Sequence, residues 1–182
     1  MPLMSATLSL FDVAPRYVID TNVVVAFLRN SDEGPYARDV MPREWELFER
    51  LMGSGEIIDP KQVEVELAAW ENQIPDMKPW LIKHRHMFRE LTNSQLERAK
   101  RIVNAYPDYG SSKNYLGDLE VLSRAGALEI AIITLERVRP NISRPQPKIP
   151  EVCPEFRIDC CSVTGFLRRE KHRGEAHSAS AS

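Results

Sequence analysis

The sequence has no large excess of charge of either sign, since 24 Lys and Arg residues are balanced by 26 Asp and Glu residues. A protein that coats nucleic acid through its overall charge is therefore excluded, and any contact with nucleic acid must come from a local basic patch. Cysteine is scarce, and Cys153, Cys160 and Cys161 show none of the Cys and His spacings of a zinc site. We therefore expect a reduced, cytoplasmic compartment.

Long apolar runs are missing as well. Residues 1–10 lack the basic start and the extended apolar core of a signal peptide. No run reaches the ~18 apolar residues that a membrane span needs, so we expect a soluble protein with no membrane partner. Its 182 residues, 43% of them hydrophobic, suit one α/β domain with a substantial core.

Apolar runs and helical periodicities alternate along the chain. Short strands are predicted at residues 17–19, 56–58, 130–133 and 156–160. Helices are predicted at residues 23–28, 43–52, 78–88, 118–127 and 163–169. A further helix would open after Asp59 as its N-cap, and another after Thr92, whose partner in a capping box would be Gln95. Loops are expected at residues 107–113 and 134–150.

This alternation predicts the fold class and the domain layout. We expect an α/β protein with a mainly parallel sheet that helices cover on both faces. Residues 1–16 would form an N-terminal extension, residues 17–173 one folded domain, and residues 174–182 a disordered tail.

Four acidic side chains fall beyond the carboxyl ends of the predicted strands, where parallel sheets gather their ligands. Asp20 follows the first strand, and Glu136 follows the strand that ends at Ile133. Glu66 and Asp118 lie on helices that start at the same edge. Clustered acids repel one another unless a cation neutralises them, and hard oxygen ligands favour Mg²⁺ or Mn²⁺. Such ions activate water and stabilise a leaving oxygen, so the predicted reaction is phosphodiester hydrolysis.

Each acid also has a purely structural explanation, which the sequence leaves open. Asp20 and Asp118 could cap the helices that follow them. Glu66 could be an ordinary solvated helix residue. Because Glu64 and Glu71 lie on the same predicted helix, spacing alone does not select Glu66.

The loop after the fourth acid is basic. Its basic residues are Arg137, Arg139, Arg144 and Lys148. Beside a carboxylate pocket they could hold the phosphates of RNA and offset the negative field of the acids. The alternative is an ordinary solvated loop, in which Glu136 pairs with its neighbour Arg137.

The motifs around these acids resemble those of PIN domains, the family of the VapC-type toxin ribonucleases. Residues 18–23, Val-Ile-Asp-Thr-Asn-Val, are similar to the family's opening motif, and residues 63–67 to its second acidic motif. Asp118 stands where the third acid opens a helix, and residues 134–136, Thr-Leu-Glu, resemble the family's Thr-x-Asp. Residues 148–153, Lys-Ile-Pro-Glu-Val-Cys, resemble the branch called domain of unknown function 4411, or DUF4411.

The resemblance covers roughly residues 17–169 and implies both a fold and an activity. The fold would be a PIN-like three-layer α/β/α sandwich with a central, mainly parallel sheet of four or five strands. The activity would be that of an Mg²⁺- or Mn²⁺-dependent endoribonuclease acting on RNA, a toxin held inactive by a cognate antitoxin. The catalytic metal ligands would be Asp20, Glu66, Asp118 and Glu136. Thr21, Asn22 and Thr134 would orient those carboxylates. Formation of a homodimer is left open.

The sequence departs from the family pattern at two places, and the altered fourth acid motivates the first of two alternative hypotheses. The fourth acid is Glu136 rather than aspartate, and Leu119-Glu120 follows Asp118 where the branch has Pro-Trp. The first alternative is a catalytically weak PIN-like module that binds RNA or a protein partner. The second is an unrelated α/β binding domain in which the acids only cap helices.

Overall fold

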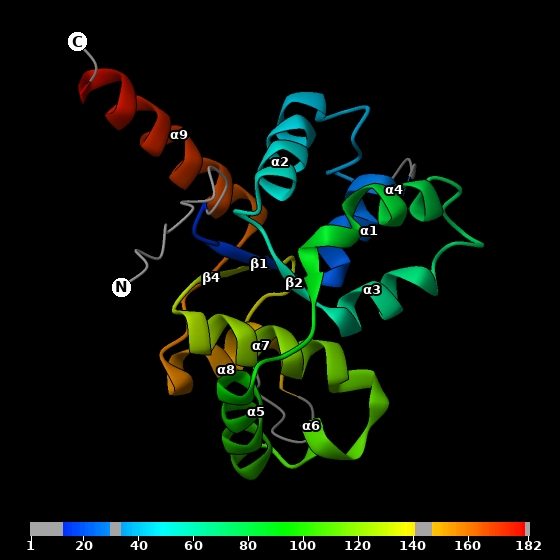
Figure 1. Ribbon diagram of the computed structural model, residues 1–182, viewed down its shortest axis with the longest axis vertical. Coiled ribbons are helices and arrows are strands. Elements are labelled where there is room, and N and C mark those ends of the chain that lie inside the picture. The colour runs from blue at the N-terminus through cyan, green and yellow to red at the C-terminus, as the bar shows by residue number, and fades with distance from the viewer. Residues whose placement is uncertain (1–12, 30–33, 141–146, 181–182) are drawn as a thin grey trace, which may run out of the picture.

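The structure, a computed structural model, describes residues 13–29, 34–140 and 147–180 (Figure 1). Its main sheet contains β1 (Tyr17–Ile19), β4 (Ala131–Ile133) and β5 (Cys160–Cys161), in the order β1-β4-β5. All neighbours in this sheet are parallel, with Val18 opposite Ile132 and Ile132 opposite Cys160. The predicted parallel sheet is therefore confirmed.

A second pair of parallel strands forms a separate, two-stranded sheet next to the first. It contains β2 (Asp59–Pro60) and β3 (Phe88–Arg89). The segment just before β2 lies beside β1, because Ile57 forms a parallel bridge with Tyr17 and the Ile58 amide donates to the Tyr17 carbonyl at 3.1 Å. The carboxyl ends of β1 and β2 therefore point to the same edge.

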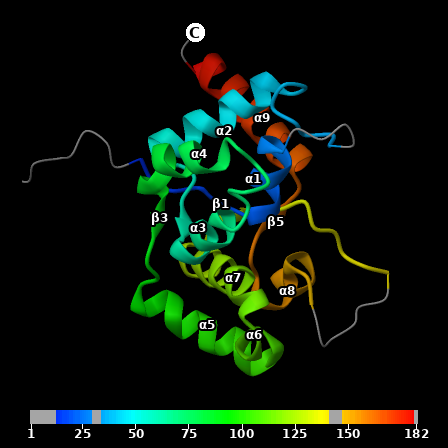
Figure 2. The same ribbon diagram turned by 90° about the vertical axis from the view of Figure 1, so that its right-hand side faces the viewer.

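Helices cover both faces of the strands. The α-helices are α1 (Thr21–Leu28), α2 (Pro42–Ser54), α3 (Lys61–Ala68), α4 (Met77–His84), α5 (Asn93–Ala105), α6 (Asp108–Ser111), α7 (Leu116–Leu128), α8 (Ile149–Phe156) and α9 (Val163–Ser180). Two short 3-10 helices are η1 (Arg85–Met87) and η2 (Lys113–Tyr115). Figures 1 and 2 show α2 and α9 on one side of the strands and α7 with α5 on the other. This arrangement is compatible with a three-layer α/β/α fold.

Aromatic side chains hold the layer of α1, α2 and α9 together. Phe48 of α2 lies 4.5 Å from Phe166 of α9 and 5.1 Å from Phe27 of α1, measured between ring centroids. All three rings are fully buried. Tyr17 of β1 meets the Phe166 ring edge-on, which joins this layer to the sheet.

Arg124 of α7 joins the opposite layer to the sheet, and it is the largest fully buried side chain of the described residues. Its guanidinium donates to the carbonyls of Asp59, Arg89 and Glu90 at 2.9, 2.7 and 3.0 Å. A buried guanidinium is tolerated only when such acceptors replace water. Arg124 therefore anchors β2 and β3 on α7.

The predicted N-cap at Asp59 is wrong. Helix α3 begins at Lys61 with Pro60 at the cap position, and Asp59 belongs to β2, fully buried. Its Oδ1 accepts the backbone N–H of Ile19 at 2.9 Å, so a long-range bond to β1 takes the side chain that a local cap would use.

Several other expected bounds need correction. Phe88, expected in a helix, belongs to β3, and the expected loop at 107–113 contains α6. The expected strand at 156–160 is replaced at its start by α8, which buries Ile149, Val152 and Cys153. Helix α9 runs to Ser180, so residues 174–180, expected to be disordered, are helical. The capping box of Thr92 and Gln95 is confirmed.

No helix within the described ranges is long and apolar enough to cross a membrane.

Candidate active site

Asp20 lies where β1 ends and α1 begins, between the carboxyl ends of β1 and β4. Its backbone N–H donates to the carbonyl of Ile133 at 2.9 Å, and its side chain is 6% exposed. Oδ2 accepts two side-chain bonds at 2.6 Å, from Thr134 Oγ1 and Asn22 Nδ2. Asp20 occupies the N-cap position of α1, as the capping alternative expects, but its side chain makes no capping hydrogen bond.

Glu66 reaches the same region from α3. Its Oε2 accepts a hydrogen bond from Thr21 Oγ1 at 2.8 Å. A Cβ atom added to Gly117 would stand 2.1 Å from Glu66 Oε1, so the carboxylate fills the space that this glycine leaves beside α7. The other acids of the sequence segment lie elsewhere: Glu64 pairs with Lys61, and Glu71 follows the end of α3.

Asp118 lies directly after Gly117, in the first turn of α7. It is not the N-cap, since Tyr115 holds that position. The partial positive charge of a helix N-terminus favours an acid in this turn. Asp118 is thus next to the glycine against which Glu66 packs.

The acids share one electrostatic environment. Burial, and then the charges of Asp20, Glu136 and Glu66, raise the pKa of Asp118 to about 8. Burial is also the main reason why the pKa of Asp20 rises to about 6, with smaller contributions from the charges of Glu136 and Glu66. A cation bound beside these two carboxyls would remove the repulsion and so stabilise their ionised forms.

Glu136 has a different set of partners. Its backbone N–H donates to Thr134 Oγ1 at 3.0 Å, which places it beside the Asp20 carboxylate. Its Oε1 accepts from Lys148 Nζ at 2.6 Å and its Oε2 from the N–H of Ile149 at 2.9 Å. The alternative pairing of Glu136 with Arg137 is thus replaced by a pairing with Lys148 and the start of α8.

Thr21, Asn22 and Thr134 connect the acids to the backbone. Besides their bonds to the carboxylates, the Asn22 Oδ1 accepts the N–H of Leu135 at 3.2 Å, and Asn22 Nδ2 lies 3.4 Å from Thr134 Oγ1. The loop after β4 is therefore tied to the first turn of α1. This network fixes the direction in which the Asp20 carboxylate points.

The chemistry of the donor set fits a hard divalent cation. Carboxylate oxygens are the preferred ligands of Mg²⁺ and Mn²⁺, and Asp20, Glu66 and Asp118 supply them from three separate elements. In the described part of the chain, however, no three His, Cys, Asp or Glu side chains form a ready-made ligand set. A cation would have to draw these carboxylates together out of their present hydrogen bonds.

Among the basic residues predicted to hold RNA, those that the structure describes differ in their partners and exposure. Arg139 forms a paired contact with Glu151, its Nη2 lying 2.7 Å from Oε2, and Lys148 is bound to the fourth acid. Arg137 is exposed beside the site. Arg144 lies outside the described residues.

Gly117 and the Lys148 bond to Glu136 are features that sequence reasoning missed. A glycine in the first turn of a helix, directly before an acid, is a weak signal for a side chain packed against the backbone. The contact of Lys148 with Glu136 joins residues 12 positions apart in the sequence, and no local pattern indicates it.

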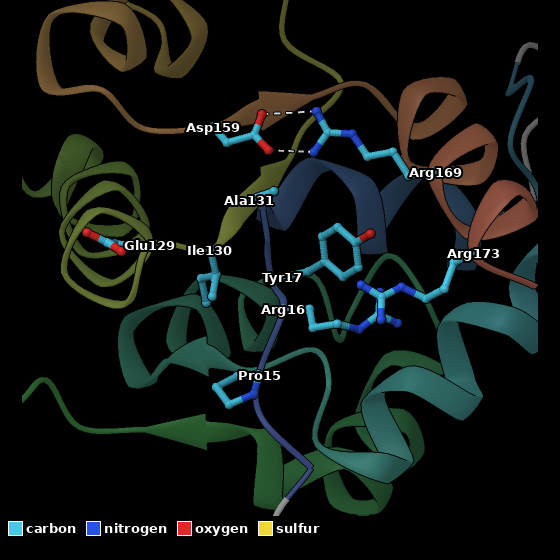
Figure 3. Close-up of a pocket in the computed structure, with 9 residues that line it drawn as sticks. All are labelled: Pro15, Arg16, Tyr17, Glu129, Ile130, Ala131, Asp159, Arg169 and Arg173. Carbon is cyan, nitrogen blue, oxygen red and sulfur yellow. Dashed lines mark hydrogen bonds and ion pairs between the residues drawn. The ribbon is translucent and has the colours of Figure 1, made fainter. Parts of the chain in front are cut away.

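A hollow of about 490 Å³ lies at the opposite edge of the sheet from the acids, where β1 and β4 begin (Figure 3). Arg16, Arg169 and Arg173 line it. The guanidinium of Arg169 faces the carboxylate of Asp159 (Figure 3), to which it donates two hydrogen bonds of 2.6 and 2.9 Å. Arg16 and Arg173 both pair with Glu170. Because each guanidinium already faces an acid, this pocket is a poor candidate for binding phosphate.

Comparisons with known proteins give one relationship. Neither the curated proteins nor the solved structures include a match to this chain. A family profile described as a domain of unknown function, DUF4411, matches residues 17–173, which span every strand and all four acids described above. The chain therefore belongs to the DUF4411 family.

Proposed function

We propose that the protein is a PIN-like, Mg²⁺- or Mn²⁺-dependent endoribonuclease that hydrolyses phosphodiester bonds of RNA. The observation that carries this proposal is the position of Glu66, which accepts a hydrogen bond from Thr21, the neighbour of Asp20, and lies beside the first turn of α7, where Asp118 stands. Glu66 packs against the glycine that precedes Asp118, and the charges of both other acids raise the Asp118 pKa. Carboxylates gathered in this way are typical of sites that hold a metal against a phosphodiester.

The protein's own groups would orient and balance the site. Thr134 and Asn22 hold Oδ2 of Asp20, and Thr21 holds one oxygen of Glu66. A bound divalent ion supplies an activated water and stabilises the leaving oxygen. The exposed Arg137 lines a hollow together with Thr134 and Glu136, and in this proposal it would contact a phosphate of the RNA.

The resemblance to VapC-type toxins extends the proposal to a biological role. The protein would be the toxin of a toxin–antitoxin pair, in which a cognate antitoxin covers the acid site until it is removed. Such a partner would be expected to bring a basic side chain to the three acids, because an ammonium or guanidinium can neutralise them as a metal does.

A catalytically weak module that binds RNA or a protein is the second candidate. Two observations favour it: both oxygens of Glu136 are already occupied, and the acids of the described residues do not form a finished ligand set. In that case the site would bind without cutting.

Cleavage of a pooled RNA substrate by the purified protein distinguishes the two. The comparison is of wild type with Mn²⁺ or Mg²⁺, wild type with EDTA, Asp20→Asn, and Glu64→Gln as a control on the same helix as Glu66. The proposal predicts metal-dependent cleavage that Asp20→Asn abolishes and Glu64→Gln retains. If folded wild-type protein, free of any antitoxin, cuts no RNA, the binding module is the better account.

A further inference from the structure

The carboxylate of Glu136 is held on both sides. Oε1 accepts from Lys148 Nζ at 2.6 Å, and Oε2 accepts the first backbone N–H of α8, that of Ile149, at 2.9 Å. The Glu136 side chain is 14% exposed and that of Lys148 46% exposed. Both oxygens of this carboxylate already accept hydrogen bonds, one of them from an ammonium group. The carboxylate would therefore gain little free energy by exchanging these bonds for a metal ion.

Lys148 is itself fixed in place by its own helix. Its backbone N–H donates to Glu151 Oε2 at 2.9 Å, and Glu151 also pairs with Arg139 through the Nε and Nη2 atoms at 2.9 and 2.7 Å. The ammonium therefore projects from an anchored helix start rather than from a loosely held loop.

The ion pair belongs to the acid site and not to a remote surface. Thr134 Oγ1, which accepts the Glu136 N–H at 3.0 Å, donates to Asp20 Oδ2 at 2.6 Å. One resident cation thus already balances part of the negative charge.

We propose that Lys148 is a built-in cation of this site, which neutralises Glu136 and leaves Asp20, Glu66 and Asp118 as the ligands of a single divalent ion. The inference rests on the proposed metal site. It differs from the sequence-based expectation that Glu136 is a fourth ligand. Glu136 becomes a positioning residue, which joins the start of α8 to the loop after β4.

The number of ligands is tested by titrating the full chain with Mn²⁺. Binding is measured by calorimetry and, independently, by the electron spin resonance signal of free Mn²⁺. Wild type should bind one Mn²⁺ per chain. Glu136→Gln keeps an oxygen for the Ile149 N–H, and should bind one Mn²⁺ with a dissociation constant changed by at most about threefold. Asp118→Asn removes a ligand and should weaken binding by more than the ~10–100-fold typical of outer-shell changes.

Lys148→Met provides the complementary result. Without the ammonium, Glu136 becomes an unpaired acid beside the others, so Mn²⁺ should bind on the order of tenfold more tightly, or a second ion should bind. Glu64→Gln, outside the site, should match wild type. Thermal unfolding of each variant without metal shows whether it is folded before its titration is compared.

Three results would overturn the inference. The first is binding of two Mn²⁺ ions to wild type, with one of them lost in Glu136→Gln. The second is an equal loss of Mn²⁺ affinity in Glu136→Gln and Asp118→Asn, and the third is an unchanged Mn²⁺ affinity and stoichiometry in Lys148→Met. Two ions together with RNA cleavage would reject the inference and leave the nuclease standing. One ion without cleavage would reject the nuclease and leave the inference standing. If wild type binds no Mn²⁺, both are wrong.

Discussion

Thr134 and Asp20, 114 residues apart in the sequence, share a buried hydrogen bond of 2.6 Å from Oγ1 to Oδ2. The same Oγ1 accepts the N–H of Glu136, so the hydroxyl lies between two of the acids. The end of β1 and the end of β4 are thereby joined by a side chain as well as by the sheet. The orientation of Asp20 depends on this single hydroxyl and on Asn22.

Removing that hydroxyl should disturb both stability and metal binding. Thr134→Val keeps the shape but deprives the buried Asp20 oxygen of a donor, which should cost about 1–3 kcal/mol of unfolding free energy. Mn²⁺ affinity should fall by about 10–100-fold, as for other groups that orient metal ligands. Urea unfolding and Mn²⁺ titration measure the two effects. Thr134→Ser retains the hydroxyl and should stay close to wild type; equal losses in both variants would contradict this role.

A methyl group at Gly117 should displace Glu66. The added Cβ would stand 2.1 Å from Oε1 and 2.4 Å from the carboxyl carbon, so the carboxylate must move away from Asp118. Gly117→Ala should therefore weaken Mn²⁺ binding and RNA cleavage by tenfold or more, about 1.4 kcal/mol. Helix α7 itself should persist, because Ala favours helices more than Gly does.

Gly53→Ala is the matched control. Gly53 also lies in a helix, but its added Cβ meets nothing within 4 Å. It should leave Mn²⁺ binding and cleavage unchanged. If Gly117→Ala behaves like Gly53→Ala, the contact between Glu66 and Gly117 does not support the site.

Metal affinity should rise with pH. The pKa of Asp118 is raised to about 8 and that of Asp20 to about 6, and both must be ionised to bind a metal. The Mn²⁺ dissociation constant should therefore fall by about tenfold per pH unit between pH 6 and pH 8, and level off above. Titrations at several pH values measure this slope, and an affinity independent of pH in this range would reject it.

The stability of the metal-free protein should change in the opposite direction. Because the folded-state pKa values of Asp20 and Asp118 lie above the ordinary value of 3.8, the stability linked to their protonated forms is fully present below about pH 4. It is lost as the pH rises through about 6 and then about 8. Saturating Mn²⁺ should restore it, which thermal unfolding with and without the ion can show.

Arg124 should contribute to the stability of the fold and not to RNA cleavage. Arg124→Met leaves the carbonyls of Asp59, Arg89 and Glu90 without a buried donor, and should lower the unfolding free energy by about 3 kcal/mol. Arg101→Met, on the exposed surface of α5, should change it by less than about 0.5 kcal/mol. Equal stability of the two variants in urea would show that the anchor is dispensable.

The sequence predicts correctly those parts of the fold that depend on residues adjacent to one another in the chain. The apolar run of β1 with the Asp-Thr-Asn that follows, and the capping box of Thr92 and Gln95, are visible in a few consecutive positions and are present in the structure. The family resemblance selects Glu66 over Glu64. The structure places Glu66 against Gly117, which spacing along one helix does not show.

The parts that sequence missed depend on distant partners. Asp59 looked like a helix cap because a proline and a helix follow it, but the N–H of Ile19, 40 residues away, takes its carboxylate. The sequence pattern indicates no helix at α8, because it predicts a loop up to residue 150 and a strand only from residue 156. The first N–H of this helix donates to Glu136, 13 residues earlier in the sequence. The residues next to Asp59 or α8 do not indicate which distant group will bind there, so local patterns alone cannot predict such contacts.

The most direct test of the central claim is anomalous diffraction from crystals of the protein soaked in Mn²⁺. The account predicts one manganese peak per chain, coordinated by carboxylate oxygens of Asp20, Glu66 and Asp118, with Glu136 still bound to Lys148. No peak at these carboxylates, or a peak only elsewhere on the protein, would contradict the metal site and with it the proposed nuclease.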